Sequence, residues 1–259
     1  MRIVTLNVNG IRSAARKGLY SWLVRQRADV VCLQEIRADH ALLADRAFRP
    51  PSLEAHFFPA QRKGYAGVAV YSRRAPDAVQ AGLGPGCEDL DAEGRYLALR
   101  FGDLSVASVY LPSGSSGPHR QAAKLDFMAR FLPFLERLRA SGREFALCGD
   151  WNIAHRPIDL KNWRANQKHS GFLPEERAWL DEVFGRVGFI DAFRQVDPRA
   201  EQYTWWSNRG RAWEKNVGWR IDTQIVTPGL GARARAARIY KDRRFSDHAP
   251  LVMDYDWPF

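Results

Sequence analysis

Short runs of strand-forming residues recur along the whole chain, and helical patterns separate several of them. Runs of this length, rich in Val, Ile and other apolar residues and bounded by turn residues, predict buried strands. Strands that alternate with helices predict an α/β fold of packed layers. The runs are RIVTLNV (2–8), DVVCLQ (29–34), GVAVYS (67–72), LSVASVYL (104–111), EFALCG (144–149), IDTQIVT (221–227) and PLVMDY (250–255).

Three segments show the spacing of amphipathic helices. Segment 18–27 places Leu19, Trp22 and Leu23 on one face. In segment 119–140, Pro133 interrupts the apolar stripe and is expected to kink or divide the helix. Segment 173–188 has Pro174 as a start signal and Gly188 as a stop signal. The stripe of the second helix consists of Leu125, Met128, Leu132 and Leu135.

We expect residues 1–259 to form a single catalytic domain, because no linker or low-complexity segment divides the chain. The flexible stretch LPSGSSGP (111–118) directly follows a predicted strand, which favours a functional loop. TLNVNG (5–10) and CGDWNI (148–153) both end a strand in an Asn-containing polar turn. Two similar halves of the chain that meet at a shared site would show such a repeated feature.

The chain is strongly basic, with 39 Lys and Arg against 29 Asp and Glu and a formal net charge of +10. This excess attracts polyanions such as nucleic acid, although a merely soluble basic surface is the alternative. The three cysteines have no paired spacing, as is usual in a reducing cytosol. Without a signal peptide or an apolar stretch long enough to span a bilayer, we expect a soluble cytoplasmic protein with no membrane partner.

Polar side chains stand at the ends of several predicted strands. Each one alone is more often a turn or cap residue than a catalyst. If the strand ends converge on one rim, however, the side chains form a hydrolytic site on rigid elements. The residues are Asn7, Asn9, Gln34, Glu35, Tyr110, Asp150, Asn152, Asp222, Asp247 and His248.

The residue types in this set favour phosphoester hydrolysis by water. The chain has no nucleophilic Ser or Cys motif and no Gly-rich phosphate loop. Asp150 is the candidate base, and Asn152 is suited to orient it or to donate to an oxyanion. Oxygen ligands without a Cys or His cluster favour Mg²⁺ over Zn²⁺, with Glu35 as the first candidate ligand. A buried Asp partner would keep His248 protonated for phosphate binding.

Longer motifs resemble the exonuclease III family of abasic-site endonucleases. The elements QE, GDxN and SDHxP also occur in other relatives with the deoxyribonuclease-I-like fold, including inositol-phosphate phosphatases and sphingomyelinases. The stretches around 162–172 and 216–222 are more specific to the DNA-repair branch. The motifs are LNVNGIR (6–12), LQEIR (33–37), VYLPSG (109–114), GDWNIAH (149–155), DLKNWRANQKHSGF (159–172), YTWWSNRG (203–210), NVGWRID (216–222) and SDHAPL (246–251).

The resemblance implies a four-layered α/β sandwich, with two mixed sheets packed face to face and helices outside. It also implies a role for each matching residue. Glu35, Asn9 and Asp247 would lie at the metal, and Asp150 would activate or orient the attacking water. His248, with its partner Asp222, would bind the scissile phosphate together with Asn7, Asn152 and Tyr110. Trp205, Trp219 and Ile221 would form a pocket for a flipped sugar that lacks its base. The residues that would bind substrate are Asn162, Asn166, His169, Phe172, Trp205, Arg209, Trp219 and Ile221. For the two tryptophans, core packing is the alternative.

Three positions depart from the usual pattern of the family or bear on its branches. His169 stands where relatives often carry Asn, and Asn9 is neutral where some relatives carry Asp. Gly171 is small and would leave room for DNA beside the flipped sugar, whereas a bulky residue there would favour an enzyme that only trims 3′ ends. Arg209 would reach the DNA from its loop, with a solvated turn residue as the alternative.

The resemblance therefore implies a DNA-repair hydrolase that depends on Mg²⁺, with Mn²⁺ as a substitute. It would act as a monomer on duplex DNA and cut 5′ to abasic sites, with 3′-phosphodiesterase, 3′-phosphatase and 3′→5′ exonuclease activities at blocked 3′ ends. The alternatives are a 3′-end-trimming exonuclease without endonuclease activity, a phosphoesterase of the same fold for small molecules or lipids, and a DNA-binding module without catalysis.

Overall fold

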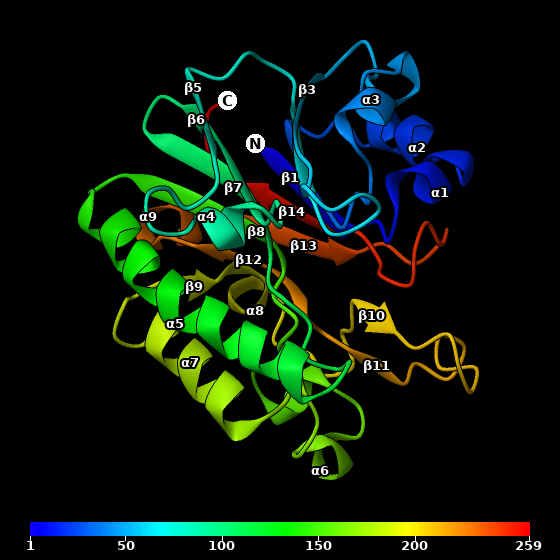
Figure 1. Cartoon of the computed structure of the whole chain (residues 1–259), viewed down its shortest axis with the longest axis vertical. Helices are drawn as coiled ribbons and strands as arrows, with labels where there is room; N and C mark the ends of the chain where they lie inside the picture. Colours follow the sequence, from blue (N-terminus) through cyan, green and yellow to red (C-terminus); the bar gives the residue numbers. More distant parts are fainter.

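Two six-stranded sheets packed face to face form the centre of the molecule (Figure 1). The computed structural model describes residues 1–259. The first sheet has the order β13 (Ala234–Ile239), β14 (Leu251–Tyr255), β1 (Arg2–Asn7), β2 (Val30–Gln34), β4 (Val68–Ser72) and β3 (Glu54–Phe58). The second has the order β5 (Ala78–Ala81), β6 (Tyr96–Phe101), β7 (Leu104–Tyr110), β8 (Glu144–Asp150), β12 (Asp222–Val226) and β9 (Ile190–Asp191).

Helices cover the outer face of each sheet and complete four layers (Figure 1). Helices α1 (Ile11–Arg16), α2 (Leu19–Gln26) and α3 (His40–Leu43) lie against the first sheet, and α5 (Pro118–Ala140) and α7 (Pro174–Phe184) lie against the second. The predicted four-layered α/β sandwich is confirmed.

The remaining elements are short. They are η1 (Arg46–Phe48), α4 (Glu88–Asp91), η2 (Pro157–Asp159), α6 (Trp163–Asn166), α8 (Ala192–Val196), α9 (Pro228–Gly231) and the two-stranded pair β10 (Trp205–Trp206) and β11 (Gly218–Trp219).

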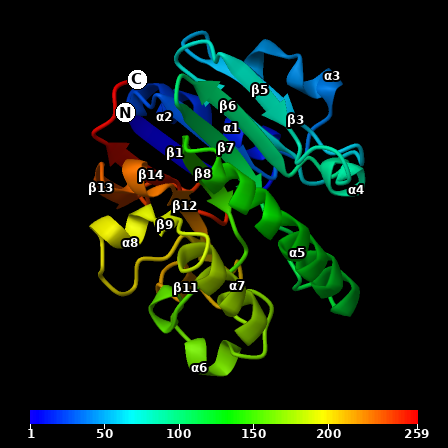
Figure 2. The same cartoon turned by 90° about the vertical axis from the view of Figure 1, so that its left-hand side faces the viewer.

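The core has three apolar layers because the central strands of both sheets are buried on both faces. Side chains such as Val30 and Val106 fill the space between the sheets. Trp22 of α2 packs on the outside of the first sheet, and Phe131 of α5 packs on the outside of the second. The two chain termini lie side by side (Figures 1 and 2), and the amino group of Met1 donates to the carbonyl of Tyr255 at 2.9 Å. No helix combines the length and the apolar character that crossing a bilayer requires.

All seven predicted strands are present, but two of the predicted helices differ in detail. Helix α5 runs through Pro133 without division, so that part of the prediction is wrong. Pro133 lies on the exposed side, and the flanking Phe131 and Phe134 anchor the helix in the core. Leu125, placed on the apolar stripe from the sequence, is 36% exposed. Helix α7 ends at Phe184, four residues before Gly188.

The sequence similarity between the ends of β1 and β8 is matched by a similar local structure. In each sheet a parallel pair, β1–β2 or β8–β7, is flanked by an antiparallel strand, β14 or β12. The side-chain oxygen of Asn7 accepts from the N–H of Asn9 at 2.9 Å, and that of Asp150 accepts from the N–H of Asn152 at 2.8 Å. Asn9 and Asn152 both have positive φ, 44° and 51°. Asn7 also donates to Asp150 at 2.9 Å, so the two strand ends meet.

Candidate active site

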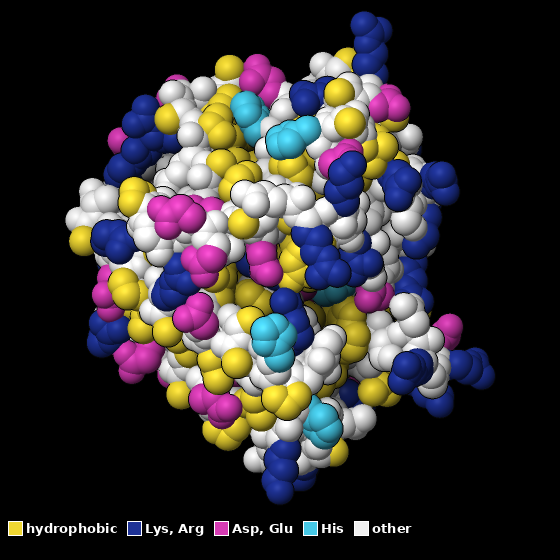
Figure 3. Space-filling model, viewed as in Figure 1, with side chains coloured by type: hydrophobic (Ala, Val, Ile, Leu, Met, Phe, Trp, Pro, Cys, Tyr) yellow, Lys and Arg dark blue, Asp and Glu magenta, His cyan; other side chains and the backbone are white.

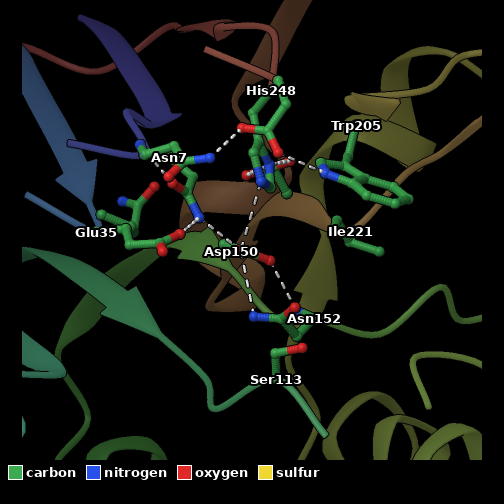
Figure 4. A network of polar contacts seen from close by, with 12 residues as sticks. Asn7, Glu35, Ser113, Asp150, Asn152, Trp205, Ile221 and His248 are labelled. Atoms are coloured by element: carbon green, nitrogen blue, oxygen red, sulfur yellow. Dashed lines mark hydrogen bonds and ion pairs between the residues drawn. The ribbon is translucent and has the colours of Figure 1, made fainter. Parts of the chain in front are cut away.

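Eight of the ten predicted polar side chains line one cavity of about 470 Å³ at the ends of β1, β2, β7 and β8. The other two, Gln34 and Asp222, are fully buried, and Gln34 donates to Ser108 Oγ at 2.8 Å instead of reaching the cavity. Figure 4 shows the polar network inside it, with side chains from both sheets directed toward Asp150. The cavity is lined by Asn7, Asn9, Glu35, Arg37, Tyr110, Ser113, Ser115, Asp150, Asn152, Asn166, His169, Ser170, Gly171, Trp205, Trp219, Ile221, Asp247 and His248.

Asp150 lies on the floor of the cavity and is 2% exposed. Its carboxylate accepts from Asn7 Nδ2 at 2.9 Å and from the backbone N–H of Asn152 at 2.8 Å (Figure 4). Burial and the nearby charge of Asp222 raise the pKa of Asp150 to about 7. A carboxylate with this pKa is able to accept a proton from water at neutral pH.

His248 and Asp222 form a buried pair beside Asp150. Asp222 is fully buried, and its Oδ2 lies 2.8 Å from His248 Nδ1. Burial alone would lower the pKa of His248, but the charges of Asp222 and Asp150 outweigh it and raise this pKa to about 10. The imidazole is therefore a cation at neutral pH, with Nε2 4.0 Å from Asp150 Oδ2. Asp222 does not line the cavity, and its carboxylate contacts the lining residue His248.

Glu35 extends into the cavity from the turn after β2. Its backbone has a φ of 56°, a strained conformation for a residue other than Gly that is common at functional sites. Oε2 accepts from Asn7 Nδ2 at 2.9 Å, and Oε1 accepts from Arg37 Nε at 2.9 Å. Across the cavity, Asn9 Nδ2 donates to Asp247 Oδ1 at 2.9 Å.

Two groups of side chains compete as a metal site. Ligand atoms of Asp150, Asp222 and His248 lie within 4.8 Å of one another. A protonated imidazole repels a cation, however, and Nδ1 of His248 already faces Asp222. Glu35, Asp247 and Asn9 present only hard oxygen donors from carboxylate and amide groups, which is the donor set that Mg²⁺ prefers. The oxygen donors that Glu35, Asp247 and Asn9 direct into the cavity therefore fit a metal better.

Tyr110 contributes a neutral phenol to the cavity wall. Burial and the charges of Glu35 and Asp150 raise the pKa of Tyr110 well above its usual value, so the hydroxyl remains a donor. The guanidinium of Arg95 stacks on this ring at 4.8 Å from its centroid and donates to the Tyr110 carbonyl at 3.0 Å. Arg95 is 2% exposed, and its packing holds the phenol in place from behind.

An apolar wall stands next to the polar network. Trp205 and Trp219 face each other across the β10–β11 pair, with ring centroids 6.4 Å apart in an edge-to-face arrangement. Ile221 completes the wall (Figure 4). Both tryptophans are only partly buried: one part of each packs against the small cluster that contains Ile221, and another part lines the cavity. Phe172 differs from the prediction: it is fully buried and packs against Ile221 from behind, because the turn at Gly171 directs it inward.

Asn162 and Arg209 lie outside the cavity. Asn166 and His169 line it, whereas Asn162 is exposed and its carbonyl accepts from Asn166 Nδ2 at 2.8 Å. Arg209 is exposed on the loop after β10, where its N–H donates to Ser207 Oγ at 3.1 Å. The substrate contacts assigned to Asn162 and Arg209 therefore remain predictions.

Four lining residues were missed from the sequence: Arg37, Ser113, Ser115 and Ser170. Arg37 follows Glu35 by two residues, and its exposed side chain folds back onto that carboxylate. Ser113 and Ser115 belong to the 111–118 loop, and their hydroxyls lie 2.9 Å apart. The flexible composition of this loop was a signal for the segment, but it did not identify the residues that reach the site.

Comparison with known proteins identifies the family. The model of the endonuclease/exonuclease/phosphatase family matches residues 4–248. The chain belongs to this family. An exodeoxyribonuclease of Bacillus subtilis is 37% identical over 258 residues, which cover 98% of both chains. The predicted resemblance is confirmed, and the chain falls in the branch of the family that contains exodeoxyribonuclease III and the abasic-site endonucleases, enzymes of DNA repair.

Two solved structures of this family are close matches in shape. An abasic-site (AP) endonuclease from Archaeoglobus fulgidus superposes with a TM-score of 0.90 at 28% identity, covering 99% of this chain and all of that one. A 3′ phosphatase from Neisseria bound to a product DNA hairpin also gives a TM-score of 0.90, at 27% identity and the same coverage. One fold therefore carries both kinds of activity, and specificity depends on the local site.

Proposed function

We propose that this chain is a DNA-repair hydrolase that cuts the backbone of duplex DNA 5′ to an abasic site. The observation that carries the proposal is the apolar wall of Trp205, Trp219 and Ile221 directly beside the Asp150–His248 centre. A phosphodiester centre alone would serve any phosphoester. The wall adds a surface for a deoxyribose without a base, and an abasic nucleotide is easily flipped because little stacking is lost.

In the proposed reaction, water attacks the phosphorus on the 5′ side of the abasic nucleotide. Asp150 accepts a proton from this water, the new P–O bond forms, the bond to the 3′ oxygen of the preceding nucleotide breaks, and that oxygen takes up a proton from solvent. The products are a 3′ hydroxyl and a 5′ phosphate on the abasic sugar. Protonated His248 is suited to stabilise the negative charge that the phosphate develops, and the donors Asn7, Asn152 and Tyr110 support the same charge.

We propose that Glu35 holds Mg²⁺, with Asn9 and Asp247 beside it, and that Mn²⁺ can replace it. When bound, the cation supplies charge neutralisation at the phosphate and at the departing oxygen. The strained φ of 56° at Glu35 and the all-oxygen donor set support this assignment. Arg37 contacts Glu35, so it is expected to turn away when the cation binds.

Basic side chains next to the cavity support duplex DNA as the substrate. A groove of about 630 Å³ shares Asn9 and Arg37 with the site. Its cations are Arg12, Arg16, Lys17 and Arg37. Figure 3 shows Lys and Arg gathered along the right-hand edge, over α1 and α2 and over the loop after β10. Such an edge is suited to follow the phosphates of a duplex.

We further propose that residues 1–259 act as one catalytic domain and as a monomer. The core between the sheets joins residues from Ile3 to Tyr255, which favours a single folding unit. The same centre would also process a blocked 3′ end, because trimming breaks the same kind of phosphoester bond. The relative with 3′ phosphatase activity makes an enzyme restricted to 3′ ends the second candidate.

The decisive experiment compares two duplexes, one with a single internal abasic analogue and one with a recessed 3′ end. We expect Mg²⁺-dependent incision of the first, with a 3′ hydroxyl product, and loss of activity when the metal is chelated. Degradation of the recessed end without incision would support the 3′-trimming enzyme. Hydrolysis of inositol phosphates but of neither duplex would indicate a small-molecule phosphoesterase, and binding without cleavage in either metal would indicate a DNA-binding module.

A further inference from the structure

The two tryptophans of the apolar wall differ in one contact. Trp205 Nε1 donates to Asp247 Oδ2 at 3.1 Å, and Figure 4 shows this indole nitrogen directed into the polar network. Trp219 lines the same cavity but has no hydrogen bond from its indole nitrogen to a residue of the site. One wall residue of the proposed sugar pocket is thus joined directly to a carboxylate of the proposed metal site.

The indole completes the hydrogen bonding of Asp247. Oδ1 accepts from Asn9 Nδ2 at 2.9 Å and from Ser246 Oγ at 3.3 Å, so Oδ2 has Trp205 as its donor. Without the indole, the carboxylate would keep donors on Oδ1 only, and the position of Oδ2 would be less restricted. A carboxylate near a metal binds best when such outer contacts fix its orientation in advance.

The backbone around Trp205 is fixed to the same segment. Trp206 N–H donates to the Asp247 carbonyl at 3.2 Å, and Ala249 N–H donates to the Thr204 carbonyl at 2.7 Å. The Thr204 hydroxyl oxygen accepts from the N–H groups of Ile221 and Asp222, both at 3.1 Å. Segment 204–206 therefore joins the strand that carries the wall to the turn that carries Asp247 and His248, so the backbone of Trp205 has a fixed position relative to Asp247.

We propose that Trp205 is a positioning residue for Asp247, which couples the sugar pocket to the metal site. Its ring forms part of the wall, and its N–H orients a carboxylate that the cation needs. Filling the pocket would then stabilise the arrangement that binds the metal, and metal binding would favour pocket filling to the same degree. This inference rests on the proposed metal and sugar sites and adds the connection between them.

Phenylalanine at each position provides matched variants, because it keeps an aromatic wall and removes the N–H. We expect Trp205→Phe to weaken Mn²⁺ binding about tenfold in calorimetric titrations without DNA, the lower end of what loss of such an outer contact costs. Trp219→Phe should leave Mn²⁺ affinity unchanged. In cleavage assays, Trp205→Phe should raise the Mg²⁺ concentration needed for half-maximal rate, whereas Trp219→Phe should raise KM for abasic duplex.

Equal Mn²⁺ affinity in the wild type and Trp205→Phe would overturn the inference. An equal loss in both variants would also overturn it, because general damage to the wall would then be the cause. Thermal unfolding and far-ultraviolet circular dichroism check that both variants fold. Failure of the wild type to bind Mn²⁺ or to cut abasic duplex would count against the proposed function instead, so the two failures are distinguishable.

Discussion

Asp150 and Asp222 lie directly opposite each other in the antiparallel pair of β8 and β12, yet only Asp222 is hydrogen bonded to His248. The imidazole places Nδ1 2.8 Å from Asp222 and Nε2 4.0 Å from Asp150. The carboxylate of Asp222 therefore binds the protonated imidazole of His248, whereas the carboxylate of Asp150 remains able to accept a proton. This asymmetry separates the proposed base from the proposed phosphate-binding pair.

Replacing Asp150 by Asn tests its role as the base. The amide keeps the size of the carboxylate and one acceptor oxygen, so either Asn7 Nδ2 or the Asn152 N–H loses its acceptor, and the amide cannot take a proton at neutral pH. We expect turnover to fall by a factor on the order of 10²–10⁴ while affinity for abasic duplex changes little. Single-turnover cleavage and a binding titration in the presence of Ca²⁺ measure the two quantities. Turnover near that of the wild type would exclude Asp150 as the base.

The rate of cleavage should have a bell-shaped dependence on pH. Asp150 must be ionised to accept a proton, so activity should rise as the pH passes its pKa of about 7. His248 must be protonated, so activity should decline as the pH passes its pKa of about 10. In Asp222→Asn, the carboxylate that raises the pKa of His248 is lost, and the alkaline limb should move to lower pH. An unchanged alkaline limb in that variant would assign it to another group.

A buried ion pair behind the site should contribute strongly to stability. Lys124 and Glu176 are both fully buried, 2.7 Å apart, and Lys124 also donates to the Asn152 carbonyl at 2.8 Å. Glu176 Oε2 accepts from the N–H of Gly171 at 2.6 Å, so the pair holds two segments of the cavity wall. We expect Lys124→Met to reduce the free energy of unfolding by about 3–5 kcal/mol, because Glu176 is left as an unpaired buried charge.

The exposed pair of Lys161 and Glu201 supplies the control for this measurement. Its side chains are 41% and 51% exposed, so water screens the attraction. Lys161→Met should change the free energy of unfolding by less than about 1 kcal/mol. Urea denaturation of the two variants compares them directly. Equal effects would mean that burial does not determine the contribution of the Lys124 pair.

The strands that the sequence predicted are buried on both faces, where a continuous apolar run is typical, but Tyr96–Phe101 was missed although five of its six residues are buried. The strand Ala78–Ala81 was missed because all four residues are exposed, and only pairing with β6 makes it a strand. Ala234–Ile239 was missed for the same reason: its Arg residues belong to an edge strand with exposed positions. Edge strands depend on a neighbour that local composition does not reveal.

The candidate site shows the same limit. Strand ends identified Asp150, Asn152 and Glu35, because a charge after a buried strand is locally unusual. The bond from Trp205 to Asp247 joins residues 42 positions apart and has no local signal. The inward turn of Phe172 was equally hidden, because it depends on the positive φ of 96° at Gly171. The residue types in the sequence reveal candidate site residues, whereas the hydrogen-bond and packing partners of these residues follow only from the tertiary structure.

Gly171 offers a test of the space beside the proposed sugar pocket. A Cβ at this position would lie 3.1 Å from the Trp219 ring and 3.3 Å from the Asn152 carbonyl oxygen. We expect Gly171→Leu to reduce incision of abasic duplex by at least about tenfold, because the side chain would crowd the flipped sugar and cost more than about 1.4 kcal/mol of transition-state binding. Removal of nucleotides from a recessed 3′ end should be affected less.

Gly142→Leu is the control for the backbone strain that a side chain at positive φ introduces. Gly142 has a φ of 72°, but a Cβ there would meet nothing within 4 Å, and the turn lies between α5 and β8, away from the cavity. Both variants bear the strain, whereas only Gly171→Leu narrows the pocket. The ratio of the incision rate to the 3′-trimming rate should therefore fall in Gly171→Leu and stay at the wild-type value in Gly142→Leu. The same ratio in the wild type and both variants would argue against a sugar pocket at Trp219.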